Sequence, residues 1–304
     1  MTSFLELMNR MSYRSTLAAY LFLSPWVIGL LIFVGGPIVA IFILSLTKWD
    51  LLGSPTWIGL RNYINMFQGK GDFWLVFANT LIYTVIGVLV SVVWALFTAL
   101  LLNQKVPGTG LAGALFFAPA VVPYIATAFA LQLILRGDLG ILNYWLRVIG
   151  VRNPPSWLMD PQVIIWVLPA LTIYTFYTGQ MMLIFDAALK EVPKELYEIA
   201  QLDGASSLTI FTKVTLPMMS PILLFNVIVS FINTLNMSFT VIYPLTAGGP
   251  GKTSTVLSVD LYENAFKGFR IGYACAEAVV LFVLCVLGTA CIFWLSRRRV
   301  YYEA

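Results

Sequence analysis

Six long apolar runs constrain this chain more than any other feature of its sequence. They cover roughly residues 17–46, 74–102, 111–135, 162–188, 214–242 and 273–296. A bilayer span needs about 20 mostly apolar residues, and each run reaches that length. Of the 304 residues, 60% are hydrophobic and only 11% are charged, whereas a soluble domain carries about a quarter charged residues. The sequence therefore predicts an all-α integral membrane protein with six transmembrane helices.

The chain leaves no room for a separate soluble domain. The gaps between the apolar runs reach about 25–30 residues, which is too short to bury a core. We therefore expect residues 1–304 to form a single transmembrane domain. The first run contains Gly35-Gly36-Pro37 and is too long for the core of a cleaved signal peptide. We expect it to be a retained helix that is either tilted or broken at these residues.

The loop charges give a weak indication of which side of the membrane each loop faces. Lys and Arg are equally numerous on the two sides of the predicted spans. On the side of the termini they lie in shorter segments, and "SRRRV" directly follows the last span. Because Lys and Arg are enriched in cytoplasmic loops, this pattern favours cytoplasmic termini. The regions 47–73, 137–161 and 243–272 are then extracytoplasmic loops, and an amphipathic stretch at 139–150 predicts a helix at the membrane surface.

The residue types argue against several kinds of site. The chain has no histidine, which is the commonest catalytic acid–base, and its three cysteines lie in one apolar run. We therefore expect no metal site and no enzyme activity, and we interpret the cysteines as packing residues. The net charge of +4 is small and the basic residues are scattered, so nucleic acid is not an expected partner.

The stretch "LTAGGPGKTS" at 245–254 resembles a phosphate-binding loop only at its end. Such a loop needs a glycine where Thr246 stands, together with a row of backbone N–H donors. Pro250 has no N–H to donate. The stretch also falls on the predicted outer side, away from cytoplasmic ATP. We therefore expect ATP to be used by another chain.

The polar stretch "EVPKELYEIAQLDGASSLTIFTKVTLP" at 191–217 predicts two short helices between the fourth and fifth spans. Pro193 can begin a helix over 194–202, because its missing N–H would be unpaired there. Asp203-Gly204 ends that helix, since glycine adopts the positive φ of a sharp turn. Ser206 or its neighbour can cap the second helix. The pattern is compatible both with a docking knob and with a simple connecting loop.

This stretch resembles the EAA motif of ABC importer permeases, commonly written E-A-A-x-x-D-G-A with a later L-P, although Ile199 stands where alanine is usual. The resemblance implies a type I ABC importer permease fold with both termini cytoplasmic, in a bacterial or archaeal cell membrane. It also implies that residues 191–213 dock on a separate ATPase dimer. The residues that match the motif, and to which this coupling role is carried over, are Glu198, Ala200, Asp203, Gly204, Ala205, Phe211 and Pro217.

Other stretches narrow the resemblance to the carbohydrate-uptake subfamily typified by the maltose permeases. They are "LSLTKWD", "WIGLRNY", "FWLVFANTLIYT", "GILNYWL", "WLMDP", "LTAGGPGKTSTVL" and "GYACAEAVVLF". The subfamily implies a binding-protein-dependent inner membrane component that pairs with a second, homologous permease. It implies that the partner ATPase uses ATP and Mg, while this chain binds no cofactor. The loop that faces the extracytoplasmic solute-binding protein would include Thr246, Gly248, Gly249 and Pro250.

Polar side chains inside a span are costly, and the fifth span is rich in them. Asn233 and Asn236 lie three residues apart and share a helical face. Amides beside aromatic rings suit hydroxyl-rich solutes, and the family places its sugar contacts in this span. The same groups can instead hold neighbouring helices together. The residues predicted to line the solute path are Ser230, Asn233, Asn236, Phe239, Thr240, Tyr243 and Glu277.

Alternatives remain for Glu277, for the cargo and for the class of transporter. Glu277 can touch a cationic solute, face a second permease or pair with Arg270, and we favour the structural pair. The central parts of the spans lack Lys and Arg, which favours a neutral sugar or oligosaccharide over glycerol 3-phosphate or another polyol derivative. An ion-coupled secondary transporter is the competing class, but we find no clear internal repeat of the kind such transporters carry.

Overall fold

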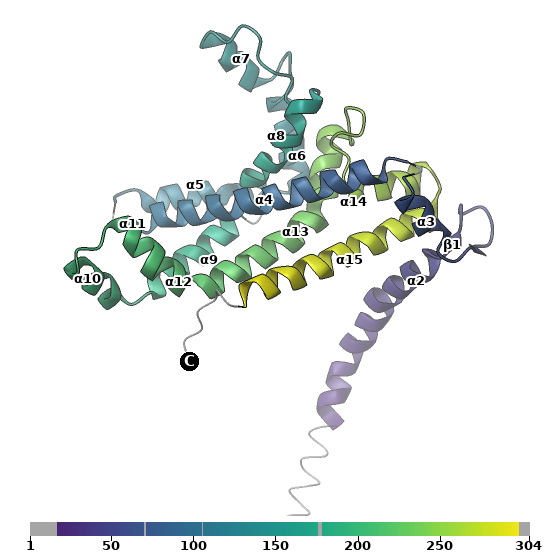
Figure 1. Cartoon of the computed structure of the whole chain (residues 1–304), viewed down its shortest axis with the longest axis horizontal. Helices are drawn as coiled ribbons and strands as arrows, with labels where there is room; N and C mark the ends of the chain where they lie inside the picture. The colour runs from purple at the N-terminus through teal and green to yellow at the C-terminus, as the bar shows by residue number, and fades with distance from the viewer. Residues whose placement is uncertain (1–16, 70, 105, 176–177, 298–304) are drawn as a thin grey trace, which may run out of the picture.

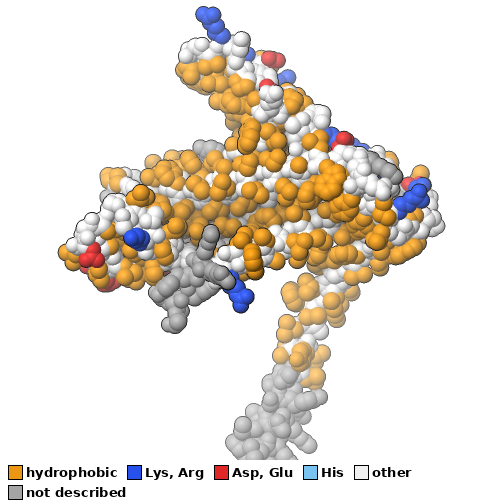
Figure 2. Space-filling model, viewed as in Figure 1, with side chains coloured by type: hydrophobic (Ala, Val, Ile, Leu, Met, Phe, Trp, Pro, Cys, Tyr) orange, Lys and Arg blue, Asp and Glu red, His pale blue; other side chains and the backbone are white. Residues whose placement is uncertain are grey.

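The computed structural model of the chain describes residues 17–69, 71–104, 106–175 and 178–297, and these are helical almost throughout. Within these ranges, strand pairing is limited to β1 (Thr47–Lys48) and β2 (Thr56–Trp57), which pair antiparallel. Figure 2 shows hydrophobic side chains over the sides of the helical bundle, while charged side chains gather toward its ends and at the tip of a projecting arm. This distribution is typical of a protein whose sides face lipid.

Four helices are each long and apolar enough to cross a membrane. They are Leu17–Leu44, α4 (Phe73–Leu102), α13 (Ser220–Thr246) and α15 (Ile271–Ser296). Two bent pairs also qualify: α5 (Thr109–Val121) with α6 (Tyr124–Ile134), bent by 102°, and α8 (Pro161–Thr175) with α9 (Thr178–Glu191), bent by 49°. The described chain therefore holds four spans, or six if each bent pair is one span.

Proline accounts for the sharper bend. Val122 has an extended backbone with ψ of 133°, and Pro123 follows it as the N-cap of α6. A residue before proline is pushed out of the helical region, so α5 ends there. The first span behaves differently, because a π-helical turn at Leu31–Gly35 leads directly into α2 (Gly36–Leu44). The first span is one helix, Leu17–Leu44, so the alternative of a break at Gly35-Gly36-Pro37 is wrong.

Small residues let the central helices approach closely. A Cβ at Gly288 on α15 would overlap the ring of Phe231 on α13. A Cβ at Gly87 on α4 would lie 3.2 Å from a methyl group of Thr172 on α8. Such contacts between small and large residues are how helices pack where lipid removes the hydrophobic driving force.

The two ends of the bundle carry different elements (Figure 1). At one end lie α10 (Lys194–Leu202), α11 (Ser207–Ile210), the π-helical turn η2 (Phe211–Thr215) and α12 (Leu216–Met218). At the other end lie the strands, α3 (Arg61–Phe67), α14 (Leu257–Tyr262) and the π-helical turn η3 (Glu263–Lys267). The helix α7 (Ile141–Val148) forms the tip of the arm, and Leu17–Leu44 diverges from the bundle.

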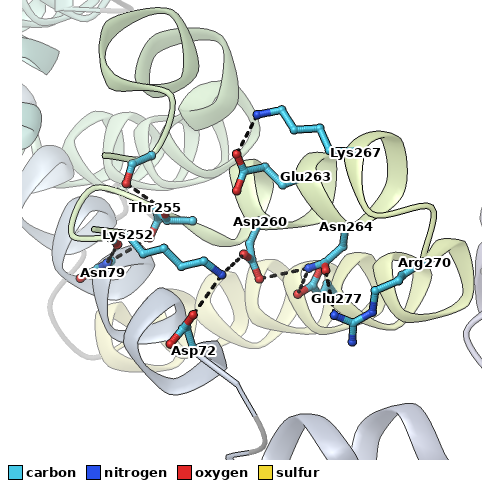
Figure 3. Close-up of polar contacts among 11 residues, drawn as sticks. Asp72, Asn79, Lys252, Thr255, Asp260, Glu263, Asn264, Lys267, Arg270 and Glu277 are labelled. Carbon is cyan, nitrogen blue, oxygen red and sulfur yellow. Dashed lines mark hydrogen bonds and ion pairs between the residues drawn. The ribbon is translucent and has the colours of Figure 1, made fainter. Parts of the chain in front are cut away.

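A chain of polar contacts ties the elements at this second end together (Figure 3). Lys252, in the loop after α13, pairs with Asp72 before α4 and with Asp260 on α14, each at 3.2 Å. The Asn264 amide donates to Asp260 at 3.2 Å. It also donates to both carboxylate oxygens of Glu277 on α15, at 3.1 Å each. One amide therefore bridges two buried carboxylates.

The Lys252 ammonium offsets part of the negative charge of this network. Partial burial lowers its pKa, but the charges and hydrogen bonds of Asp260 and Asp72 outweigh burial, so the pKa is raised above its ordinary value. A raised pKa in the folded state means that the stabilisation is complete at neutral pH. It is lost only in strongly alkaline solution, as the pH passes the raised pKa.

Replacing Asn264 by leucine should lower the thermal stability of the chain. The change removes the shared donor while leaving the carboxylates of Asp260 and Glu277 buried, and such a loss costs roughly 3 kcal/mol. Thermal unfolding of the purified chain in detergent, followed by tryptophan fluorescence, measures the effect. Asn153→Leu is the control, because Asn153 is exposed in a loop of the arm. Equal unfolding temperatures for the two variants would contradict this role for Asn264.

Candidate functional site

The turn between α10 and α11 is closed by two backbone hydrogen bonds around Gly204. The Ala205 N–H donates to the Ala200 carbonyl and the Gly204 N–H to the Gln201 carbonyl, both at 3.0 Å. This pattern requires a left-handed residue, and Gly204 has a φ of +74°. No atom of the described chain lies within 4 Å of a Cβ built at Gly204. Within this chain, the backbone angle rather than crowding is what requires glycine.

The helices of this segment begin where local signals predict. The structure begins α10 directly after Pro193 and ends it at Leu202, as expected. The Ser206 hydroxyl accepts a hydrogen bond from the Thr209 N–H at 3.3 Å and caps α11. The chain then stays helical through η2, which begins at Phe211, and α12, which contains Pro217. The segment therefore runs into α13 with little interruption.

Side chains fix the segment to the bundle. The Tyr197 hydroxyl on α10 lies 3.2 Å from the Thr215 hydroxyl in η2. Tyr197 also packs against a buried cluster that includes Leu189 of α9 and Met219 at the start of α13. These contacts join α10 to the spans α9 and α13.

The outward surface of the segment mixes apolar and acidic side chains. Leu202 is 88% exposed, Leu208 73% and Ile199 56%. Glu198 and Asp203 are exposed beside them. Exposed apolar patches of this kind are typical of protein–protein contacts. Sequence reasoning identified the carboxylates but missed Leu202 and Leu208, although apolar residues on both sides of a glycine turn in a polar stretch were a usable signal.

One side of α13 carries polar and aromatic side chains at the edge of a buried core cluster, against which Phe239 and Tyr243 pack. Asn236 is exposed, and Phe239, Thr240 and Tyr243 are half-buried. Spacings of three and four residues place these side chains on one side of the helix. Asn233, also half-buried, lies one turn before Asn236. The structure therefore brings five of the predicted solute-path residues onto adjoining parts of one helical surface.

The other two predicted solute-path residues lie inside the bundle. The Ser230 hydroxyl is buried 3.1 Å from the Ser91 hydroxyl, which joins α13 to α4. Glu277 is 0% exposed and accepts from Asn264, whose amide oxygen accepts from Arg270 at 3.4 Å. The direct pair expected between Glu277 and Arg270 is therefore replaced, among the described residues, by a contact through Asn264. A buried carboxylate needs a donor, and Asn264 on η3 is nearer.

The loop after α13 is folded tightly on itself. The Thr246 hydroxyl lies 2.7 Å from the Ser254 hydroxyl. The Thr255 hydroxyl donates to the Gly248 carbonyl at 2.9 Å, and a Cβ at Gly248 would lie 2.6 Å from that hydroxyl. The Gly249 N–H donates to the Thr246 carbonyl at 2.9 Å. Pro250 is half-buried, and its carbonyl accepts from the Thr253 N–H at 2.9 Å. The glycines here serve close packing within the loop.

A pocket of about 440 Å³ separates this loop from the arm. Gln132, Arg136, Asp138 and Ser156 line one side of it, and Thr246 lines the other. The wall on the arm is held by Asn143, which is 1% exposed and donates to the carbonyls of Gly137 and Pro155 at 2.7 and 3.0 Å. The loops 137–161 and 243–272 are thus neighbours in space.

Comparisons with known proteins agree on the class of this protein. Residues 91–301 match the family described as the binding-protein-dependent transport system inner membrane component. The chain is 36% identical over 299 residues to the probable ABC transporter permease protein YesP of Bacillus subtilis (strain 168), covering 97% of this chain and 96% of that protein. It is 30% identical over 296 residues to the trehalose/maltose transport system permease protein MalF of Thermococcus litoralis, covering 97% and 98%.

Solved structures share the fold. A crystal structure of a bacterial ABC transporter involved in the import of the acidic polysaccharide alginate contains a chain with a TM-score of 0.80 at 23% identity, covering 96% of this chain and 99% of that one. A second structure of the alginate ABC transporter, in complex with an alginate pentasaccharide-bound periplasmic protein, gives 0.82 at 21% identity, covering 97% and 99%. The chain belongs to the family of binding-protein-dependent transport system inner membrane components, and it is a multi-pass membrane permease.

Proposed function

We propose that the chain is one permease subunit of an ATP-driven, binding-protein-dependent importer for a neutral sugar or oligosaccharide. The observation that supports this proposal is that the exposed helices α10 and α11, which we call the docking knob, are continuous along the chain with the helix that bears the predicted solute-path residues. The exposed knob of α10 and α11 runs through η2 and α12 into α13. That helix then carries the exposed Asn236 and, one and two turns further on, the half-buried Phe239 and Tyr243.

The names of relatives support a carbohydrate cargo. Besides the trehalose/maltose permease, the chain is 30% identical to the lactose transport system permease protein LacF of Rhizobium radiobacter. It is also 30% identical to the arabinooligosaccharides transport system permease protein AraP of Bacillus subtilis (strain 168). The exposed groups of α13 are uncharged amides, hydroxyls and rings, which suit hydroxyl-rich solutes. The cation nearest to this face, Lys267, is paired with Glu263 at 2.9 Å, which argues against a phosphorylated polyol.

In the mechanism that we propose, the helices of the two permeases pack together in two alternative ways, and the ATPase determines which of the two is favoured. A separate cytoplasmic ATPase dimer, which holds ATP and Mg, docks on the surface around Leu202 and Leu208. Glu198 and Asp203 supply charge at the rim of this contact. When the ATPase dimer closes, it moves the segment 191–213 and, through η2, the helix α13. The ATP-bound state must favour one of the two packings for access to alternate.

The remaining partners follow from the surfaces that this chain leaves open. A second, homologous permease covers the exposed face of α13 and completes the solute path. It also offers a partner for Leu17–Leu44, whose most apolar stretch has none of its residues buried against this chain. The loops 47–73, 137–161 and 243–272 face an extracytoplasmic solute-binding protein. In this arrangement both termini and the segment 191–217 are cytoplasmic.

Replacing Gly204 by aspartate should abolish transport without removing the chain from the membrane. A residue with a side chain at φ of +74° costs about 1–2 kcal/mol, and its carboxylate enters the docking surface. Uptake of radiolabelled maltose, trehalose and lactose by cells that express the whole importer measures the effect. Gly108→Asp is the matched control, because Gly108 has a φ of +94° and open surroundings just before α5, outside the segment 191–213. Normal uptake in Gly204→Asp would show that the turn is not needed for coupling.

Replacing Leu202 by glutamate should release the ATPase while the two permeases stay together. Leu202 is 88% exposed, so the change leaves the fold intact, but it places a charge in the centre of a contact. We expect binding-protein-stimulated ATP hydrolysis by the purified importer to fall at least about tenfold. Val106→Glu is the control, since Val106 is 53% exposed but lies in the loop between α4 and α5, outside the segment 191–213. If the ATPase still co-purifies and responds normally, the docking surface lies elsewhere.

A further inference from the structure

We propose that the chain binds the headgroup of an anionic phospholipid in a pocket at the end of the bundle remote from the docking knob. The pocket has a volume of about 370 Å³ and lies between β1, α3 and the start of α15. None of the residues that line it belongs to the predicted solute path or to the pocket beside the arm. It is therefore a site apart from those described above.

Positive charge dominates the lining of this pocket. Lys48, Arg61 and Arg270 line it together with one carboxylate, that of Asp50. In the part of the chain that the structure describes, none of the three cations forms an ion pair with a carboxylate. The Arg270 guanidinium lies over the Tyr273 ring instead, 4.5 Å from its centroid. The charges of the lining are therefore complementary to an anionic group.

Hydrogen bonds fix the floor of the pocket, so the cations stand on a rigid frame. Asn62 is 7% exposed, and its amide donates to the carbonyls of Ser45 and Thr47 at 2.8 and 2.9 Å. The Tyr63 hydroxyl donates to the Ser45 hydroxyl at 2.7 Å. A Cβ at Gly272 would overlap the Thr47 carbonyl, so α15 begins in close contact with β1. These contacts hold β1, α3 and the start of α15 together, and one cation comes from each of these three places.

The pocket lies at the level where spans leave the membrane. The first span ends at Leu44, just before Lys48, and α15 begins at Ile271, directly after Arg270. Figure 1 shows α2, α3 and the strands at the same end of the molecule. Trp49 also lines the pocket, and tryptophan is enriched at the depth of the lipid headgroups. A phosphate at this depth therefore lies within reach of the three cations.

An exposed apolar surface lies beside the cations. Leu60 is 62% exposed, Ile64 50% and Phe67 49%, and their spacings of four and three residues place them on one side of α3. Phe269, from the opposite wall of the pocket, is 55% exposed. Figure 2 shows Lys and Arg side chains next to hydrophobic ones at this end of the bundle. A short helix with one apolar side and a basic residue suits the boundary between headgroups and acyl chains.

An anionic phospholipid satisfies both parts of this surface. Its phosphate can accept two hydrogen bonds from the Arg61 guanidinium and one from the Lys48 ammonium, and bonds of this kind are strong. Its acyl chains can cover Ile64 and Phe67, which a free phosphate would leave in water. Phosphatidylcholine carries a quaternary ammonium group, which the cations of the pocket would repel. The charges therefore favour a lipid such as phosphatidylglycerol.

Native mass spectrometry of the purified full chain in non-ionic detergent tests this inference. The probes are phosphatidylglycerol and phosphatidylcholine with the same acyl chains. We expect phosphatidylglycerol to bind at least about fivefold more tightly. Lys48→Gln and Arg61→Gln should each weaken its binding about fivefold, because each removes one cation from the phosphate. Phosphatidylcholine should bind these variants as it binds the natural chain, which also shows that they are folded.

Lys267→Gln is the matched control. It removes one positive charge at the same end of the bundle, but from a lysine that is paired with Glu263 at 2.9 Å and lies outside the pocket. We expect it to bind phosphatidylglycerol as the natural chain does. An equal loss in Lys267→Gln would mean that only the total charge matters, and the pocket would be wrong. Ile64→Asn should weaken the binding of both lipids, because it places an amide against the acyl chains.

Other outcomes would assign the pocket to a different occupant. If an excess of inorganic phosphate displaces phosphatidylglycerol completely, the pocket takes a free anion and the lipid is wrong. If Lys48→Gln and Arg61→Gln bind both lipids normally but no longer hold the solute-binding protein, the pocket is a protein contact. Equal binding of the two lipids to the natural chain overturns the inference outright. Because lipid binding is measured without the ATPase, its failure leaves the importer proposal standing.

Discussion

The need to bond every backbone N–H and C=O group without water governs the rest of this structure. In the hydrocarbon core of a bilayer only a helix or a closed barrel meets that need, and the described residues of the six apolar runs are mostly helical. Interruptions such as the bend at Val122 and Pro123 leave groups that must be satisfied by neighbouring protein or by a water-filled cavity.

The same requirement explains where polar side chains occur within the bundle. The Ser91–Ser230 contact and the bond from Thr172 to the Gly87 carbonyl join α4 to α13 and to α8. Asn226 and Thr84 are exceptions: Asn226 is 0% exposed and Thr84 2%, and neither the amide of Asn226 nor the hydroxyl of Thr84 has a partner among the described residues. Buried amides are usually satisfied, so Asn226 departs from the pattern of the other polar groups on α13.

The features that could be predicted from the sequence are those with local causes. The limits of α10, the positive φ of Gly204 and the Ser206 cap depend on residues a few positions apart, and all three are confirmed. The start of the fifth span is less accurate: 214–242 was expected, but α13 begins at Ser220 because η2 and α12 occupy the preceding residues. A periodic apolar pattern does not distinguish these short turns from a continuous span.

Features with distant causes were missed. Asn264 bridges Asp260 and Glu277 because η3 folds against α15, and no spacing in the sequence indicates that contact. The contact between the rings of Tyr262 on α14 and Phe239 on α13 was missed for the same reason, because it depends on how distant segments fold together. Leu202 and Leu208 are different, because their importance lies in their exposure, which hydropathy alone does not report. The bend at Val122 had a visible signal in the proline that follows it.

The docking knob of α10 and α11 is joined to α13 through η2 and α12, and this connection has a mechanical consequence. A helix of 27 residues is about 40 Å long, so α13 can act as a lever. The docking knob is joined to its first residues, and the aromatic rings of Phe239 and Tyr243 lie near its far end. A tilt of about 6° at the base displaces the tip of such a lever by about 4 Å, close to the thickness of an aromatic ring. If α13 moves as a rigid rod, the displacement grows with distance along it, so a small movement at its base becomes a larger one at its far end.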